Sequence, residues 1–236
     1  MKNLIDPFRT LGRAALDLVF PVSCLGCGME GSYLCAACLA KLPRESRQVC
    51  IRCQQPSPFG KTHPDCRSRN FADGLISCLP YPNPLVKKTI ETFKYHFVDA
   101  LAENLSKFMA EEFENQNLSA FFGGFLLVPV PLHKRRQVWR GFNQAELLSE
   151  SLSRILNIGV EKNLLTRVRH TKPQVTLNAR ERTENMREAF SVNGIAPGKY
   201  LIIDDVVTSG STINEISKAL KRAGASEVWA ATVARD

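Results

Sequence analysis

Long apolar runs are missing from this sequence, and so is the commonest phosphate-binding loop. No window approaches the roughly 18 to 20 apolar residues of a transmembrane helix, so no membrane span is expected. The apolar stretch at residues 11–22 is interrupted by Arg13 and Asp17, which does not fit a secretory signal. The G-x-x-x-x-G-K-[ST] motif is also absent. We therefore expect a cytoplasmic protein whose phosphate site, if it has one, uses another kind of loop.

Aspartate is absent from the middle of the chain, which is strongly basic. Residues 131–190 contain twelve Lys and Arg against six Glu and no Asp. The whole chain of 236 residues has a formal net charge of +8. Such a charge favours anionic partners such as nucleotides, phosphates or nucleic acid, although it also serves plain solubility.

The most informative motif combines a strand, two acids and a small-residue turn in residues 201–212, LIIDDVVTSGST. Its apolar start predicts a buried strand, and a helix is expected from about Ile213. Backbone N–H groups of the turn, together with the helix dipole, can bind an anion. Gly210 can take the positive φ that such a turn needs. The motif therefore predicts an anion site next to two carboxylates.

Carboxylates beside an anion site suit a sugar phosphate. They accept hydrogen bonds from vicinal ribose hydroxyls or hold Mg²⁺, while the turn binds the 5′-phosphate. The alternative is an ordinary strand-to-helix turn capped by Ser or Thr. The candidate site residues are Asp204, Asp205, Val206, Val207, Thr208, Ser209, Gly210, Ser211 and Thr212, of which Asp204 and Asp205 are also the candidate catalytic residues.

Seven of the eight cysteines fall within residues 24–66, a stretch poor in periodic apolar pattern. Four pairs with a two-residue gap can each direct two ligands at one tetrahedral ion, so two structural Zn²⁺ sites are expected. A redox dithiol is the alternative for any single C-x-x-C. We favour sequential over interleaved pairing, and we expect Cys78, outside the pattern, to be buried. The candidate metal ligands are Cys24, Cys27, Cys35, Cys38 and Cys50, Cys53, His63, Cys66.

A basic loop follows the predicted strand at residues 126–130. Its side chains can neutralise a pyrophosphate or a nucleic-acid backbone, although a solvated charged loop is the alternative. Asn143 can cap the helix that follows. Trp139 and Phe142 can stack on bases, or they can be buried where the loop meets the helix. The candidate anion-binding residues of this loop are Lys134, Arg135, Arg136 and Arg140.

The remaining pattern predicts strands that alternate with helices. Strands are expected at residues 74–81, 126–130, 199–203 and 227–233, and helices at 7–20, 85–95, 100–113, 143–156 and 212–223. This order argues for an α/β fold with a mostly parallel sheet, flanked by helices, whose ligands bind at the carboxyl ends of the strands.

Residues 201–212 resemble the phosphoribosyl-pyrophosphate (PRPP) signature of type I phosphoribosyltransferases, with Ser211 in place of a second glycine. With the cysteine pairs before it, the basic loop, and a block at 171–190 that begins TKPQ, the chain from about Cys24 onward resembles the ComF family. The resemblance implies a double zinc-ribbon domain at 22–70 and a type I phosphoribosyltransferase-like domain at 71–236. The apolar pattern before them predicts an N-terminal helix at 1–21.

The resemblance also implies a function. It points to PRPP binding with Mg²⁺, to natural transformation and DNA uptake, and to single-stranded DNA and a DNA-uptake helicase or recombination partner. If the body is an enzyme, it is a phosphoribosyltransferase, with the basic loop on the departing pyrophosphate and residues 167–184 as a lid. The alternative is a non-catalytic single-stranded DNA-binding or scaffold module with a vestigial PRPP site. The acceptor, the turnover and the oligomeric state stay open.

Overall fold

The computed structural model describes residues 22–45, 47–68, 70–95, 99–133, 137–138, 141–168 and 188–236. The chain divides into two compact units, Met1–Leu42 and Pro43–Asp236. The division falls between the two groups of candidate metal ligands, so the second group belongs to the same compact unit as the sheet. The helix predicted at residues 7–20 lies outside the described residues.

The first unit contains little regular structure in its described part. A short helix, α2 (Ala36–Ala40), follows Cys35. A tight turn precedes it, in which the amide of Gly28 donates to the carbonyl of Cys24 at 2.9 Å and Gly28 has a φ of 77°. Leu34 and Leu42 are buried. So small an apolar core does not hold a chain by itself, and a bound metal is the expected source of order.

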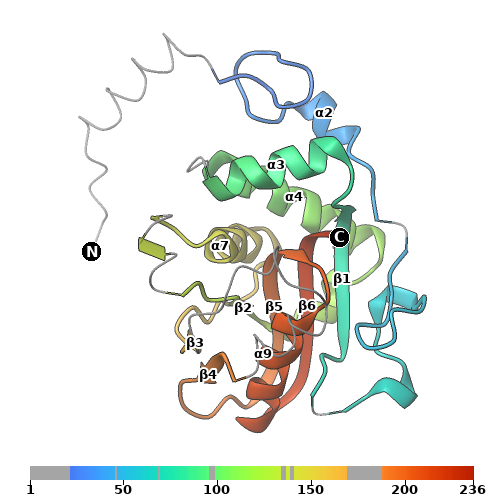
Figure 1. The fold of residues 1–236 in the computed structure, drawn as a ribbon, viewed down its shortest axis with the longest axis vertical. Coiled ribbons are helices and arrows are strands. Elements are labelled where there is room, and N and C mark those ends of the chain that lie inside the picture. Colours follow the sequence, from blue (N-terminus) through green and yellow to red (C-terminus); the bar gives the residue numbers. More distant parts are fainter. Residues whose placement is uncertain are drawn as a thin grey trace. The chain divides into compact units, whose positions relative to one another are not determined.

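The second unit is built on a four-stranded parallel sheet, as predicted. Its strands are β1 (Gly74–Pro80), β2 (Leu126–Pro129), β5 (Gly198–Val207) and β6 (Ala225–Arg235). They lie side by side in the order β1-β6-β5-β2 (Figure 1). Every neighbouring pair is parallel. All four strands therefore end at one edge of the sheet, where the two acids of β5 also lie.

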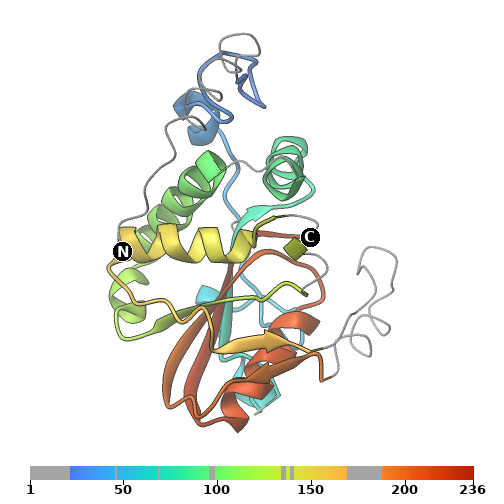
Figure 2. The ribbon, with the colours of Figure 1, turned by 90° about the vertical axis from the view of Figure 1, so that its left-hand side faces the viewer.

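Helices cover both faces of this sheet. Figure 2 shows α4 and α7 together on one side of the strands and α9 on the other. A buried row of Leu75, Val128, Ile202 and Ala230 runs across the four strands in register, and it belongs to the same apolar cluster as α9. The helices are α3 (Pro84–Tyr95), α4 (Asp99–Asn115), α5 (Ser119–Phe122), α7 (Gln144–Leu156) and α9 (Ser211–Arg222), and two 3₁₀ turns are η1 (Pro58–Gly60) and η2 (Pro64–Cys66).

Two local predictions are confirmed. Asn143 is the N-cap of α7, and its side chain accepts a hydrogen bond from the amide of Ala145 at 3.1 Å. Cys78 is fully buried in β1, and burial raises the pKa of its thiol.

The structure also differs from the sequence prediction in two places. A short antiparallel hairpin of β3 (Leu165–Arg167) and β4 (Phe190–Val192) was not expected. Strand β5 continues past its predicted end at residue 203, because Asp204 and Val206 still pair with Thr232 and Ala234 of β6. The two acids therefore lie within the last part of the strand, where parallel pairing fixes their backbone.

Candidate functional site

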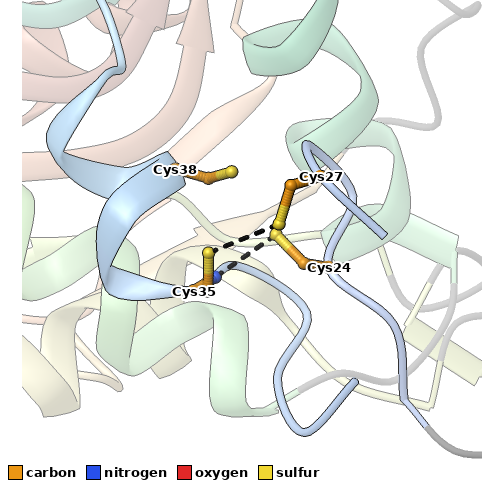
Figure 3. A group of neighbouring side chains, drawn as sticks. All are labelled: Cys24, Cys27, Cys35 and Cys38. Atoms are coloured by element: carbon orange, nitrogen blue, oxygen red, sulfur yellow. Dashed lines mark hydrogen bonds between the residues drawn. The ribbon is translucent and has the colours of Figure 1, made fainter. Parts of the chain in front are cut away.

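The first candidate metal centre consists of Cys24, Cys27, Cys35 and Cys38 (Figure 3). Their four sulfur atoms lie within 4.8 Å of one another, and the Sγ atoms of Cys27 and Cys35 are 3.7 Å apart. A tetrahedral zinc with bonds of about 2.3 Å places its sulfur ligands about 3.8 Å apart. The residues therefore fit a closed zinc site.

The electrostatics of this cluster also suit a metal. Burial opposes the ionisation of Cys24, but amide N–H groups of Cys35, Cys27 and Gly26 outweigh it and lower its pKa to about 6. Burial and the neighbouring sulfurs raise the pKa of Cys38 to about 12. Four thiolates at this spacing repel one another unless a cation lies between them, so a divalent ion is what makes the full set of ligands available.

The second candidate centre consists of Cys50, Cys53, His63 and Cys66, and it has the same dimensions. The Sγ of Cys53 is 3.4 Å from Nδ1 of His63. The other ring nitrogen, Nε2, lies 3.2 Å from the carbonyl of Pro56. A proton on Nε2 satisfies this carbonyl and leaves Nδ1 to bind the metal, which is the usual arrangement for a ligating histidine. The ligand atoms gather into two groups that are sequential in the chain, which supports sequential pairing, and His63 stands where a fourth cysteine would.

Metal analysis of reduced protein is expected to find about two zinc ions per chain, because each group supplies four ligands. Cys27→Ser and Cys53→Ser each disrupt one group and should each lower the content to about one. A content near zero in protein purified without chelators would contradict both sites.

The acidic pair at the end of β5 is held by a lysine from another element. The Nζ of Lys94, near the end of α3, lies 3.4 Å from Oδ1 of Asp205, and both side chains are mostly buried. The amide of Asp205 donates to Oδ1 of Asp204 at 2.9 Å. Burial opposes the charge of Lys94, yet the carboxylates of Asp205 and Asp204 raise its pKa above the usual value.

Asp204 is the strongly perturbed member of the pair. Burial and then the charge of Asp205 raise its pKa to about 7, against the smaller opposing effects of the Asp205 amide, Lys94 and Arg167. A carboxyl poised near neutral pH beside a second acid is typical of functional sites, because a purely structural pair gains nothing from such crowding.

Lys94 was missed by the sequence prediction. A lysine in the last turn of a helix is the ordinary partner of the helix dipole, so nothing local marked it. Its position depends on tertiary contacts, since Nε2 of the buried Gln144 donates to the carbonyl of Lys94 at 3.1 Å. Gln144 begins α7, so this bond fixes the end of α3 against the start of α7.

The predicted anion turn has the backbone that the sequence suggested. Residues 208–210 connect β5 to α9, and Gly210 has a φ of 73° and is the N-cap of the helix. The hydroxyl of Ser209 lies 3.1 Å from that of Ser211. Within the described residues, no carbonyl accepts from the amides of Ser209 or Gly210. Ser211 and Thr212 form the first turn of α9, so the turn and the helix N-terminus together offer donors to an anion.

The four basic loop residues, Lys134, Arg135, Arg136 and Arg140, lie outside the described residues, as do Trp139 and most of the predicted lid. Both ends of the loop are described. The amide of Val130 donates to the carbonyl of Ile203 at 3.0 Å, and Nδ2 of Asn143 donates to the carbonyl of Val130 at 3.1 Å. The loop therefore starts and ends beside β5, next to the acidic pair.

Comparison with known proteins identifies two domains in the chain. A family model described as a double zinc ribbon domain matches residues 15–67, and one described as a phosphoribosyl transferase domain matches residues 142–236. None of the described helices is long and apolar enough to cross a membrane.

Several known proteins are similar to this chain, among them the following three. Competence protein F of Haemophilus influenzae is 44% identical over 113 residues, which are 46% of this chain and about half (49%) of that protein. DNA utilization protein YhgH of Escherichia coli K12 is 32% identical over 204 residues, covering 83% of this chain and 88% of that protein. Competence protein ComFC of Bacillus subtilis is 28% identical over 207 residues, covering 81% and 79%. With both domains present and most of YhgH covered, the chain belongs to the ComF family.

Proposed function

We propose that this protein binds PRPP at the edge of the sheet where β5 ends. The observation that carries the proposal is the half-buried pair of Asp204 and Asp205, with Lys94 beside Asp205. Two residues later comes a turn whose N-cap glycine is left-handed. The match to a phosphoribosyl transferase domain over residues 142–236 supports it. A ligand that carries hydroxyls beside a phosphate uses both features at the same time.

In the proposed complex, Asp204 and Asp205 accept hydrogen bonds from the ribose hydroxyls, and the turn at residues 208–212 binds the 5′-phosphate. The basic loop (Lys134, Arg135, Arg136, Arg140) and Lys94 are the candidate partners of the pyrophosphate. The two carboxylates are ligands of the type that Mg²⁺ prefers, and a bound Mg²⁺ would neutralise the phosphates. When no ligand is bound, we expect Lys94 to neutralise part of the negative charge of the two carboxylates.

We further propose that the site transfers the phosphoribosyl group to an acceptor whose identity is open. When pyrophosphate departs, negative charge develops on it, close to the two ends of the basic loop. Fixed cations such as those of this loop stabilise developing charge most in a site shielded from water. Positioning and charge stabilisation supply the chemistry, so no nucleophilic side chain is required. A binding protein that retains PRPP without turnover is the alternative, and release of pyrophosphate with candidate bases separates the two.

The names of the relatives refer to competence and DNA utilization, which supports a proposed role in the handling of incoming DNA. The net charge of +8 is consistent with single-stranded DNA as a partner. A competence helicase or recombination protein is the kind of protein partner that this role would require. Binding of a single-stranded oligonucleotide that weakens steeply with salt supports DNA contact, and no binding at low salt contradicts it.

Calorimetric titration with PRPP and Mg²⁺ tests the binding proposal. Wild-type protein is expected to bind one PRPP per chain, and the double variant Asp204→Asn, Asp205→Asn should bind at least about 100-fold more weakly, because it loses two charged acceptors. Glu103→Gln, on the exposed surface of α4, is the matched control and should bind like wild type. Equal affinity in the double variant would remove the acidic pair from the site.

A further inference from the structure

The anion turn lies against a residue that adjoins the second metal centre. A Cβ placed on Gly210 would lie only 3.0 Å from Cγ1 and 3.3 Å from Cδ1 of Ile51. Ile51 directly follows the metal ligand Cys50 and is almost completely buried. It belongs to the same apolar cluster as Val207 and Ile213, which lie just before and just after the turn. The turn therefore rests on this one side chain of the metal-binding segment.

Hydrogen bonds fix the backbone of Ile51 inside the metal-binding knuckle. The amide of Gln54 donates to the carbonyl of Cys50 at 2.9 Å, and the amide of Cys50 donates to the carbonyl of Gln55 at 2.9 Å. The side chain of Gln54 donates to the carbonyl of Ile51 at 2.9 Å. These bonds shape the knuckle that directs Cys50 and Cys53 at the metal, so the position of Ile51 and the geometry of the ligands are set together.

A bound metal is expected to add order to the segment that carries the ligands. The regular structure of residues 50–66 is limited to the two three-residue turns η1 and η2 and to single bridges at Pro56 and Lys61. A metal bound to Cys50, Cys53, His63 and Cys66 ties the two arms of this segment together. Without it, the arm that carries Ile51 is expected to loosen, and the support behind Gly210 loosens with it.

We propose that Ile51 is a positioning residue for the anion turn, and that occupancy of the second metal centre thereby sets the affinity of the turn for a phosphate. The metal itself contacts no atom of the bound phosphate, and it acts on the turn only through Ile51. This inference rests on the proposed PRPP site for its binding readout. The first metal centre belongs to the other compact unit, so its loss should leave the turn unchanged.

The side-chain test uses three variants and two readouts. Ile51→Ala should weaken PRPP binding about 10-fold in calorimetry and speed amide hydrogen exchange of residues 208–213 in the unliganded protein. Ile51→Val should change the PRPP affinity and the exchange rate by less than about 3-fold each, since valine keeps most of the contact. Val49→Ala is the control and should match wild type. Val49 is buried on the same arm, but it does not belong to the apolar cluster of Ile51, Val207 and Ile213.

The metal test compares the two centres. Cys53→Ser and Cys27→Ser should each lose one metal ion per chain, but only Cys53→Ser should weaken PRPP binding, by 10-fold or more, and speed exchange in the turn. Unchanged exchange and affinity in Ile51→Ala, or equal effects of the two cysteine variants, would overturn the inference. Exchange is measured without PRPP, so it decides the inference even if wild-type protein binds no PRPP and the proposed function fails.

Discussion

Lys94→Met is expected to destabilise the unliganded protein by about 2–4 kcal/mol at pH 8, because it leaves the half-buried carboxylates of Asp204 and Asp205 without this cation. The Nζ of Lys94 lies 3.4 Å from Asp205, and the two side chains are 21% and 13% exposed, so solvent replaces the lost charge only in part. Methionine keeps most of the volume, which separates the charge from the packing. Urea unfolding at pH 8 measures the loss.

Two controls assign this loss to the acidic pair. Lys107→Met removes a lysine from an exposed pair with Glu103 on α4 and should cost less than about 0.5 kcal/mol. Adding Asp205→Asn to Lys94→Met should restore most of the stability, because the double variant no longer has the Asp205 carboxylate that lost its lysine. If the double variant is as unstable as the single one, Lys94 acts through packing and not through charge.

The second large effect is a gain of stability. Asp204 has its pKa raised to about 7 in the folded protein, from about 3.8. Its protonated form therefore supports folding at low pH, and this contribution is lost as the pH rises through 7. Asp204→Asn cannot ionise, so between pH 4 and pH 8 its stability relative to wild type should improve by on the order of 3 kcal/mol.

Urea midpoints across this pH range measure the change. A constant difference between Asp204→Asn and wild type from pH 4 to pH 8 would contradict the raised pKa. A variant that gains stability at pH 8 and loses PRPP binding would show that the carboxylate is kept for its ligand and not for the fold.

The sequence predicted the sheet and the turn because both have local signals. Apolar runs such as residues 201–203 indicate buried strands. A histidine alone does not indicate a metal ligand, but the two-residue gap between His63 and Cys66 does, since it repeats the spacing of the cysteine pairs. Gly210 could be assigned a positive φ because it is the residue in the turn that tolerates it, and the structure agrees.

The features that were missed depend on contacts between distant residues. Lys94 meets Asp205 only because Gln144 fixes the end of α3, and none of these three is near another in sequence. The contact of Ile51 with Gly210 joins residues far apart in the chain. The hairpin of β3 and β4 has three residues in each strand, which is too short for an alternating pattern to show.

A crystal structure of the protein with PRPP and Mg²⁺ tests the central claim most directly. We expect the 5′-phosphate within about 3 Å of the backbone amides of residues 208–212, and the ribose hydroxyls within the same distance of the Asp204 and Asp205 carboxylates. PRPP bound elsewhere on the protein, with the turn and the acidic pair free of ligand, would contradict the account.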